Sequence, residues 1–290
     1  MKRVGHTSHR FLFLFALLAF ACITQIDGSA QKLKAEEVLT RHANAVGADE
    51  TRASVKSRIT TGNVVVTFRE PGTGQLGGRV VLASEGPKNM LAMIFDNAVN
   101  YPHEKFAFDG ANVTGSYVRP GIRSTFGDFL LTHNTVIKHG IVGGVLSQSW
   151  PFFDLANRRL KVETGGTKKI GDRSTIQLKF YPSGGSDMRV TMFFDAETFH
   201  HVRTEYTRTV IAQMGATPET SAQQSETRYK LVEDFSDFRK EGGLTLPHTY
   251  KVLLEITGRT GTFRAEWELA LSQFQFNQRI DPTAFDVDDK

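Results

Sequence analysis

Cysteine is nearly absent from this sequence: Cys22 is the only one in 290 residues. It lies in an apolar run, Phe11–Ile23, that follows a positively charged start and precedes small residues at 28–30. These features are typical of a cleaved export signal. We therefore predict a signal peptide over residues 1–30 and a mature chain, 31–290, without disulfide, thiol nucleophile or cysteine metal site.

This first segment has two alternative fates. The apolar run is short for a membrane span, but it could be kept as an N-terminal anchor. Cys22 could instead carry a lipid, although Ala19 stands where a leucine commonly precedes a lipid-modified cysteine. We expect an exported, periplasmic protein, with attachment through Cys22 as the alternative. No later apolar run approaches ~20 residues, so the mature chain offers no second candidate span.

An excess of charge of one sign is also lacking. The chain has 35 lysines and arginines against 31 aspartates and glutamates, a net charge of +4, and no basic block stands out. Nucleic-acid binding depends on clustered positive charge that neutralises phosphates. We therefore expect no nucleic-acid partner.

Catalytic signatures are absent as well. The sequence has no G-x-S-x-G, no H-E-x-x-H, no P-loop and no glycine-rich dinucleotide fingerprint after a strand. We predict no catalytic residue, no cofactor and no metal, and hence a protein that is not an enzyme. An uncharacterised hydrolase is an alternative. It would need a polar cluster on the apolar face of the fold, and we expect polar side chains on the other face.

Two adjacent histidines are the polar groups closest to a metal site. His200 and His201 lie where a strand is predicted to begin, and neighbouring side chains of a strand point to opposite faces. One metal ion cannot bind both rings from a regular strand. We expect one solvent-facing and one half-buried histidine.

Two acidic groups are interpreted as solvated surface. Glu266 and Glu268 share one strand face with an arginine, which favours an exposed charge ladder over a catalytic carboxylate pair. Asp286, Asp288 and Asp289 lie beside the C-terminus at a spacing that does not supply the ligands of a calcium loop.

The chain does have two-residue alternation of apolar and polar residues. It runs through Met188–Phe194, Tyr250–Ile256 and Phe263–Leu271. Each stretch therefore has one apolar and one polar face, which predicts an antiparallel sheet with one side in water. A shift of parity at Ser272-Gln273 predicts a β-bulge, which would bend the last strand and help a wide sheet to curl.

Apolar spacing and turn residues predict the remaining elements. A helix is expected over Leu33–Val46 and a helical insert over Thr125–Lys138. Asp109-Gly110 predicts a hairpin within Glu104–Val118. The whole reads as one mostly β domain over 31–290 with ten or eleven strands. The other predicted strands, with a polar loop at Ala212–Gln223, are Ile59–Phe68, Arg79–Ser84, Asn89–Phe95, Leu160–Ile170, Ser174–Tyr181, Arg189–Phe194, His201–Ile211, Thr227–Phe238, Pro247–Ile256 and Thr262–Phe276.

Phenylalanine is in excess, with 22 in the chain. Two interpretations stay open: an ordinary filled core, or a hydrophobic cavity between sheet and helices that binds acyl chains through buried area. Two helices are few to cover so many strands, which favours the cavity. The residues expected to bind cargo, on the sheet and on the helical lid, are Leu91, Met93, Phe95, Phe106, Phe108, Phe126, Phe129, Leu130, Ile137, Leu178, Phe180, Val190, Met192, Phe194, Val252, Leu254 and Trp267.

Three short segments, in this order, resemble a known family. They are the strand–turn–strand element Gly78–Met90, the Asp-Gly hairpin Phe106–Val113 and the closing segment Phe276–Val287. With the exported start, first helix and helical insert, they resemble the LolA/LolB family of periplasmic outer-membrane lipoprotein-sorting carriers. The resemblance implies an unclosed half-barrel whose concave apolar face is covered by an N-terminal helix and a helical lid.

One position departs from the family pattern. The family carriers have an arginine before the proline of the first segment, where the resemblance implies a role in holding the lid closed. Gly86 stands there in this chain, and nearby Lys88 is a weaker, non-planar partner. Residues Asp234–Arg239 and Gly243–His248 look like a hairpin of broader sorting-protein relatives. The resemblance therefore supports a lipid-handling fold more than lipoprotein transport itself.

Two functions from different classes are carried forward. The first is a periplasmic carrier or chaperone for acylated or other apolar cargo, with lipoprotein or lipid acyl chains and the inner- or outer-membrane lipoprotein machinery as partners. The second is a non-catalytic structural or adaptor domain of the cell envelope with a filled core. A small residual cavity would favour the second.

Overall fold

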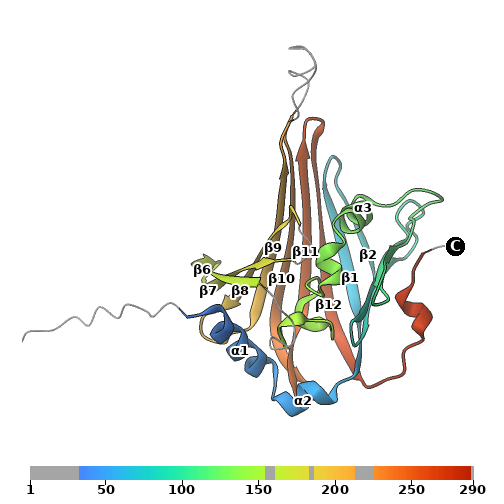
Figure 1. Cartoon of the computed structure of the whole chain (residues 1–290). Coiled ribbons are helices and arrows are strands. Elements are labelled where there is room, and N and C mark those ends of the chain that lie inside the picture. Colours follow the sequence, from blue (N-terminus) through green and yellow to red (C-terminus); the bar gives the residue numbers. More distant parts are fainter. Residues whose placement is uncertain (1–32, 154–160, 183–185, 213–224, 289–290) are drawn as a thin grey trace, which may run out of the picture. The chain divides into compact units, whose positions relative to one another are not determined.

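The computed structural model of the chain describes residues 33–153, 161–182, 186–212 and 225–288 (Figure 1). The predicted signal peptide with Cys22, most of the predicted loop Ala212–Gln223 and the acidic residue Asp289 lie outside these residues.

Twelve strands form one antiparallel sheet. Their spatial order is β5-β4-β3-β2-β1-β12-β11-β10-β9-β8-β7-β6, and the end strands do not pair with each other, so the predicted unclosed half-barrel is confirmed. Every pairing joins neighbours in the chain except that of β1 with β12. The strands are β1 (Ser57–Glu70), β2 (Gly74–Glu85), β3 (Lys88–Phe95), β4 (His103–Phe108), β5 (Val113–Gly115), β6 (Lys161–Ile170), β7 (Arg173–Tyr181), β8 (Arg189–Asp195), β9 (His201–Val210), β10 (Thr227–Glu241), β11 (Leu244–Gly258) and β12 (Gly261–Phe276).

The predicted alternation holds along these strands. Trp267 on β12 pairs with Val66 on β1 and with Val252 on β11, and all three side chains are buried. We call the face that carries these three residues the inner face and the opposite one the outer face. The register of β1 and β12 shifts so that Thr61 pairs with Gln273 and Gly62 with Leu271, which confirms the predicted bulge.

The sheet has twelve strands where the sequence indicated ten or eleven, because the segment Glu104–Val118 contributes two. The predicted turn at Asp109-Gly110 separates β4 from β5. The Asp109 carboxylate accepts hydrogen bonds from the backbone N–H groups of Ala111 and Asn112, both at 2.7 Å, as an Asx turn requires.

Few helices accompany the sheet. The predicted first helix is α1 (Ala35–Val46), and a short helix that was not predicted, α2 (Asp49–Ser54), follows it. We call residues Thr125–Phe153 the insert. The insert contains α3 (Thr125–Thr132), α4 (Thr135–Lys138) and the 3-10 turns η1 (Gly144–Leu146) and η2 (Pro151–Phe153). No helix in the described ranges is long and apolar enough to cross a membrane.

The single helix predicted over Thr125–Lys138 is wrong in its middle. The Ser124 hydroxyl accepts a hydrogen bond from the Gly127 N–H at 2.8 Å and begins α3, as expected of an N-cap. The helix then stops at Thr132, and the side-chain amide of Asn134 donates to the Leu131 carbonyl at 3.0 Å. Asn competes for backbone hydrogen bonds in this way, which favours a break over a continued helix.

The closing segment covers part of the outer face. The 3-10 turn η3 (Pro282–Phe285) buries Phe285 completely, in a small cluster with Ile280 and Ala83. The Val287 N–H donates to the Thr114 hydroxyl at 3.0 Å, next to the edge strand β5. The segment therefore shields the outer side of β2 and β3.

Candidate functional site

The apolar inner face is continuous across the sheet. Every residue predicted to bind cargo belongs to one hydrophobic cluster; all are buried except Leu91, which is partly buried against the cluster. The face therefore brings the predicted residues together.

The insert covers this face from one side of the sheet to the other. The Phe126 ring of α3 stacks on Trp267 of β12, with ring centroids 4.5 Å apart. Phe152 of η2 meets Phe180 of β7 edge-on at 5.8 Å. In Figure 1 the insert crosses in front of the long central strands. Its aromatic side chains occupy the space where a cargo was expected.

Little space is left beneath the insert. The cavity between the insert and β2–β4 has a volume of about 40 Å³. Typical ligand pockets measure roughly 300–1,000 Å³. Its walls are mainly apolar, and at one end lie Ser84, Asn89 and Ser147. In this closed arrangement the chain itself fills the space between the insert and β2–β4. An open pocket of about 810 Å³ lies farther along the sheet, beside Phe180 and Val190.

The inner face also carries buried polar groups, which corrects the expectation that polar side chains lie on the other face. Glu233 of β10 is fully buried, and its carboxylate accepts hydrogen bonds from the hydroxyls of Tyr206 and Tyr250. It also accepts one from the Gly143 N–H of the insert at 2.8 Å. Burial raises the pKa of Glu233, and the three donors oppose that rise. The signal was present in the sequence, because Glu233 has the same parity as Leu231 and Phe235.

A second buried polar cluster joins α1 to the insert and β9. The Trp150 indole N–H donates to His42 Nε2 at 3.1 Å, and His42 Nδ1 lies 2.9 Å from the Phe199 carbonyl oxygen. His201 stacks on Trp150 at 4.8 Å, and its Nε2 lies 2.8 Å from the Thr204 hydroxyl. Burial lowers the pKa of His42 to about 3 and that of His201 well below its usual value.

The expected placement of the two adjacent histidines is therefore wrong, because neither ring is solvent-facing. His201 is fully buried, while His200 is partly buried and stacks on Phe238 at 4.3 Å. The His201 ring lies under the insert, and the sequence pattern of a single strand does not reveal such a cover. No group of three or more potential metal-binding side chains occurs within the described ranges.

Acidification should destabilise the fold through His42. Its folded pKa of about 3 lies below the usual 6.5, so the unfolded chain binds a proton at higher pH than the folded chain. Its contribution to the free energy of unfolding is complete above pH 6.5 and falls as the pH drops, by about 2 kcal/mol at pH 5. Urea unfolding at pH 7.5 and 5.0 should show this loss in the wild type relative to His42→Gln. An equal pH dependence in both proteins would contradict the assignment.

A buried carboxyl also lies at the N-terminal end of α3. The Trp267 indole N–H donates to the Tyr101 hydroxyl at 3.1 Å, and Tyr101 donates to Glu104 at 2.6 Å. Burial raises the pKa of Glu104 to about 7. These three residues line an open pocket of about 210 Å³ with Phe126 and Phe263. Glu104 therefore makes the free energy of unfolding rise as the pH falls, opposite to the effect of His42. Only the comparison of the wild type with His42→Gln isolates the contribution of His42.

Arg58 of β1 is a buried cation under the insert. It is 2% exposed, and its guanidinium donates to the Val145 carbonyl of η1. With its amide oxygen turned toward Arg58, Gln148 accepts a second hydrogen bond at 3.0 Å. Arg58 forms no ion pair with a carboxylate of the described residues, and burial lowers its pKa to about 10. No role for Arg58 was predicted from the sequence, although this residue shares the parity of Val64 and Val66.

Gly86, where the family pattern has an arginine, lies away from the insert. It sits in the β2–β3 turn with φ of +54°, and a Cβ atom there would meet nothing within 4 Å. An arginine that donates a hydrogen bond to the insert, Arg58, comes instead from β1.

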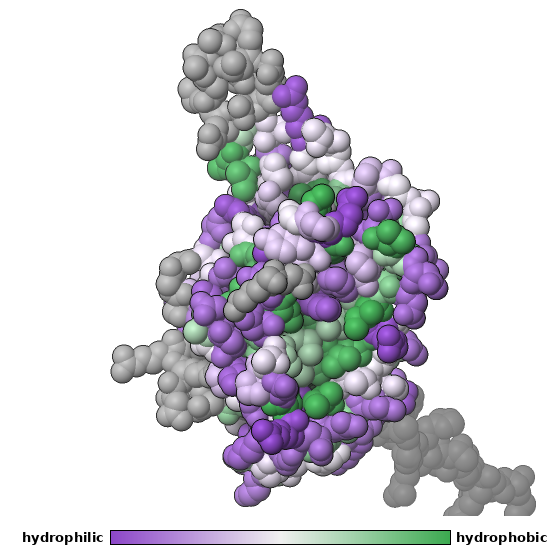
Figure 2. Space-filling view, turned by 90° about the vertical axis from the view of Figure 1, so that its right-hand side faces the viewer, coloured by the Kyte–Doolittle hydropathy of each residue, from purple (hydrophilic) through white to green (hydrophobic). Residues whose placement is uncertain are grey.

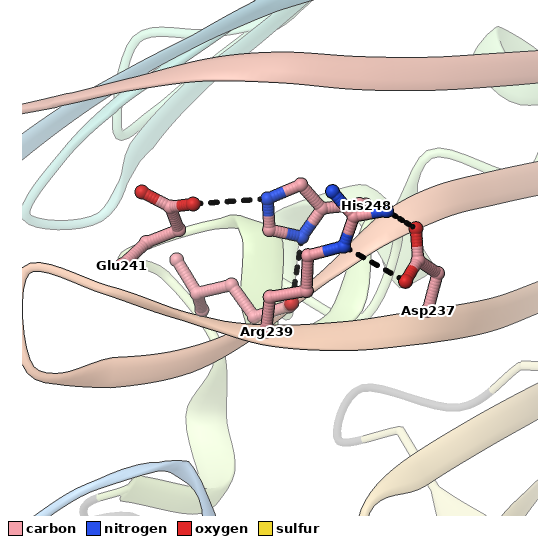
Figure 3. A network of polar contacts seen from close by, with 5 residues as sticks. Asp237, Arg239, Glu241 and His248 are labelled. Carbon is pink, nitrogen blue, oxygen red and sulfur yellow. Dashed lines mark hydrogen bonds and ion pairs between the residues drawn. The ribbon is translucent and has the colours of Figure 1, made fainter.

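The β10–β11 hairpin carries a separate polar network (Figure 3). His248 Nε2 lies 3.0 Å from Glu241, and the Arg239 guanidinium donates both its hydrogen bonds to the Asp237 carboxylate. Asp237 has φ of +55° and lies opposite His248, since Ser236 pairs with Thr249 and Phe238 with Pro247. The network therefore belongs to the local geometry of the hairpin.

The acidic residues interpreted as surface behave as expected where they are described. Glu268 pairs with Lys251 at 2.8 Å on the outer face. Asp288 lies 3.8 Å from Arg123. On the side of the chain shown in Figure 2, hydrophobic residues are bordered by hydrophilic ones. The most exposed large apolar side chains of the described residues are Val99, at 87%, and Ile211, at 77%.

Comparisons with known proteins bear on the fold. No family model and no curated protein matches the sequence. The chain is similar to a LolA superfamily protein from Nitrosomonas europaea, with 12% identity, a TM-score of 0.47 and coverage of 87% of this chain and 97% of that one. It is similar to an outer membrane lipoprotein-sorting protein domain from Vibrio parahaemolyticus, with 11% identity, a TM-score of 0.42 and coverage of 85% and 97%. A DUF1329 family protein from Desulfovibrio piger gives 11% identity, a TM-score of 0.42 and coverage of 87% and 95%.

Proposed function

We propose that the protein is an exported, non-enzymatic carrier that holds an acyl chain or another apolar cargo between the inner face and the insert. The observation that carries this proposal is the kind of cover that the inner face has. A continuous apolar surface is covered by helices of eight and four residues, which are joined through His133 and Asn134 and followed by glycines at 140, 143 and 144. Helices this short have little stability of their own, so they depend on contacts with the sheet.

Apolar cargo would replace the contacts between the insert and the sheet with contacts of its own. The closed cavity of about 40 Å³ cannot admit an acyl chain, so the insert has to move away from the sheet. The hydrogen bonds that Arg58 donates to the Val145 carbonyl and that the Gly143 N–H donates to Glu233 hold the insert in place. A cargo that buries apolar area would shift the population from the closed to the open state. Acyl groups of lipids or lipoproteins, and the machinery that hands them over, are the partners that this mechanism would serve.

A cross-link between the insert and the sheet tests the proposal. A Cβ atom at Gly115 on β5 would lie 3.3 Å from Cγ of Leu131 on α3, close enough for a disulfide between cysteines at both positions. In a mature chain without Cys22, the oxidised Gly115→Cys/Leu131→Cys variant should lose at least about ten-fold in affinity for a fluorescent fatty acid. Reduction should restore the wild-type affinity.

The single variants Gly115→Cys and Leu131→Cys are the matched controls, since they carry the same substitutions without the bridge. Equal binding by the oxidised and reduced double variant would show that the insert need not move, and would contradict the carrier mechanism.

The small cavity favours a second candidate, a structural or adaptor domain of the cell envelope with a filled core. Native mass spectrometry of the mature protein purified from its periplasm separates the two. A co-purifying acyl lipid supports the carrier. A clean apo mass, together with no uptake of the fatty-acid probe, supports the adaptor.

A further inference from the structure

The buried guanidinium of Arg58 lacks a negative partner. Its bonds go to the neutral oxygens of Val145 and Gln148, and its Nε atom has no hydrogen-bond partner although it is buried. A buried charge costs several kcal/mol unless it is paired and hydrogen-bonded. The buried Arg58 guanidinium therefore indicates a binding site for an anion under the insert.

A second unsatisfied group lies beside it. Thr60 follows Arg58 on the inner side of β1, is fully buried, and its hydroxyl has no hydrogen-bond partner. Ser84 lies opposite Arg58 on β2, and Leu82 lies opposite Thr60. Hydroxyl donors and a guanidinium on adjacent strands form the kind of cradle that carboxylate and phosphate oxygens prefer.

This polar group adjoins the apolar cavity under the insert. Leu82 and Ser84 line the cavity, and the Gln148 N–H donates to the Ser84 hydroxyl at 3.0 Å. Beyond Ser84 the walls are apolar, with Leu91 and Phe106 on the sheet and Ile137 on the insert. The space is therefore amphipathic, with one polar end and apolar walls.

We propose that the cargo is an anionic single-chain lipid, whose acid group binds Arg58, Thr60 and Ser84 while its acyl chain lies along Leu82, Leu91 and Phe106. This inference rests on the proposed carrier function and adds the chemical class of the ligand. The acid group competes with the Val145 carbonyl for the guanidinium, so binding of the acid releases one of the bonds that hold the insert closed. A carboxylate and a phosphate fit the same donors.

The test compares ligands with the same chain and different head groups at pH 8: palmitate, hexadecyl phosphate and uncharged 1-hexadecanol. The wild type should bind palmitate or hexadecyl phosphate about ten- to a hundred-fold more tightly than hexadecanol, the range expected for charge-assisted hydrogen bonds. Preference for palmitate identifies a fatty acid, and preference for hexadecyl phosphate identifies a phosphate-bearing lipid. Equal affinity for all three ligands overturns the inference.

Variants then assign the preference to the cradle. In Arg58→Met the acid-to-alcohol ratio should fall to about one, and Thr60→Val should lower the ratio without removing a charge. The matched control is Arg79→Met, which removes an exposed arginine from the outer side of the neighbouring strand and should keep the wild-type ratio. A ratio that persists in folded Arg58→Met, or in Thr60→Val if Arg58→Met does not fold, overturns the inference. Binding of hexadecanol with no acid preference leaves the carrier standing, whereas no binding of any ligand refutes both.

Discussion

Replacing Trp267 with alanine is expected to lower the free energy of unfolding by about 3–5 kcal/mol, the usual cost of removing a fully buried large aromatic side chain. Trp267 is fully buried on β12, stacks on Phe126 of the insert and donates to Tyr101. Its loss leaves a void under α3 and removes one hydrogen bond of the Tyr101 hydroxyl. Denaturant unfolding followed by circular dichroism measures the change.

The same substitution should also loosen the insert. Amide exchange in Thr125–Thr132 should accelerate more than exchange in β7 and β8, which lie far from Trp267 in the strand order. Trp267→Phe is the matched control, because it keeps an aromatic ring under Phe126 while losing the bond to Tyr101 and part of the indole volume. A loss below about 1 kcal/mol for Trp267→Ala would mean that α3 collapses onto the sheet without it.

Removing the Glu233 carboxylate is expected to have an effect of similar size. Glu233→Ala leaves the hydroxyls of Tyr206 and Tyr250 and the Gly143 N–H without their acceptor. Buried donors without a partner cost about 1–3 kcal/mol each, so for three donors we expect a loss of at least about 3 kcal/mol. Because Gly143 belongs to the insert, the variant should also take up a fluorescent fatty acid faster than the wild type.

Two controls separate the loss of the hydrogen-bond acceptor from the loss of a negative charge. Glu233→Gln keeps an acceptor oxygen and should lose less than Glu233→Ala, while Glu268→Ala on the outer face should change stability by less than about 0.5 kcal/mol. If Glu233→Ala and Glu268→Ala are equally stable, the buried hydrogen bonds do not hold the insert.

The strands were predictable because their pattern is local. In Met188–Phe194 and Phe263–Leu271 each residue's face follows from its neighbours two positions away, and pairing across the sheet preserves that parity. The bulge at Ser272 was predictable for the same reason. The break of the insert at His133 and Asn134 was not, since apolar spacing continues across it while a side-chain bond to the backbone ends the helix.

The candidate site was only partly predictable. The apolar residues share one face by parity. The volume left between that face and the insert depends on how the side chains of α3, α4 and η1 fill it. Glu233 and Arg58 have inward parity and were missed because polar residues were assigned to the outside. Their partners, Gly143 and Val145, lie about ninety positions away along the chain, so no local pattern could pair them.

The single pairing of β1 with β12 has a consequence for how the chain folds. All other strand pairs are hairpins between neighbours, which can form early from local contacts. The β1–β12 pairing brings together residues such as Lys56 and Asn277, which are 221 positions apart and joined by a 2.7 Å hydrogen bond. Closing so large a loop costs conformational entropy before any contact rewards it, and such long-range pairing slows folding. We therefore expect two hairpin meanders, β1–β5 and β6–β12, to form first and their union to limit the folding rate.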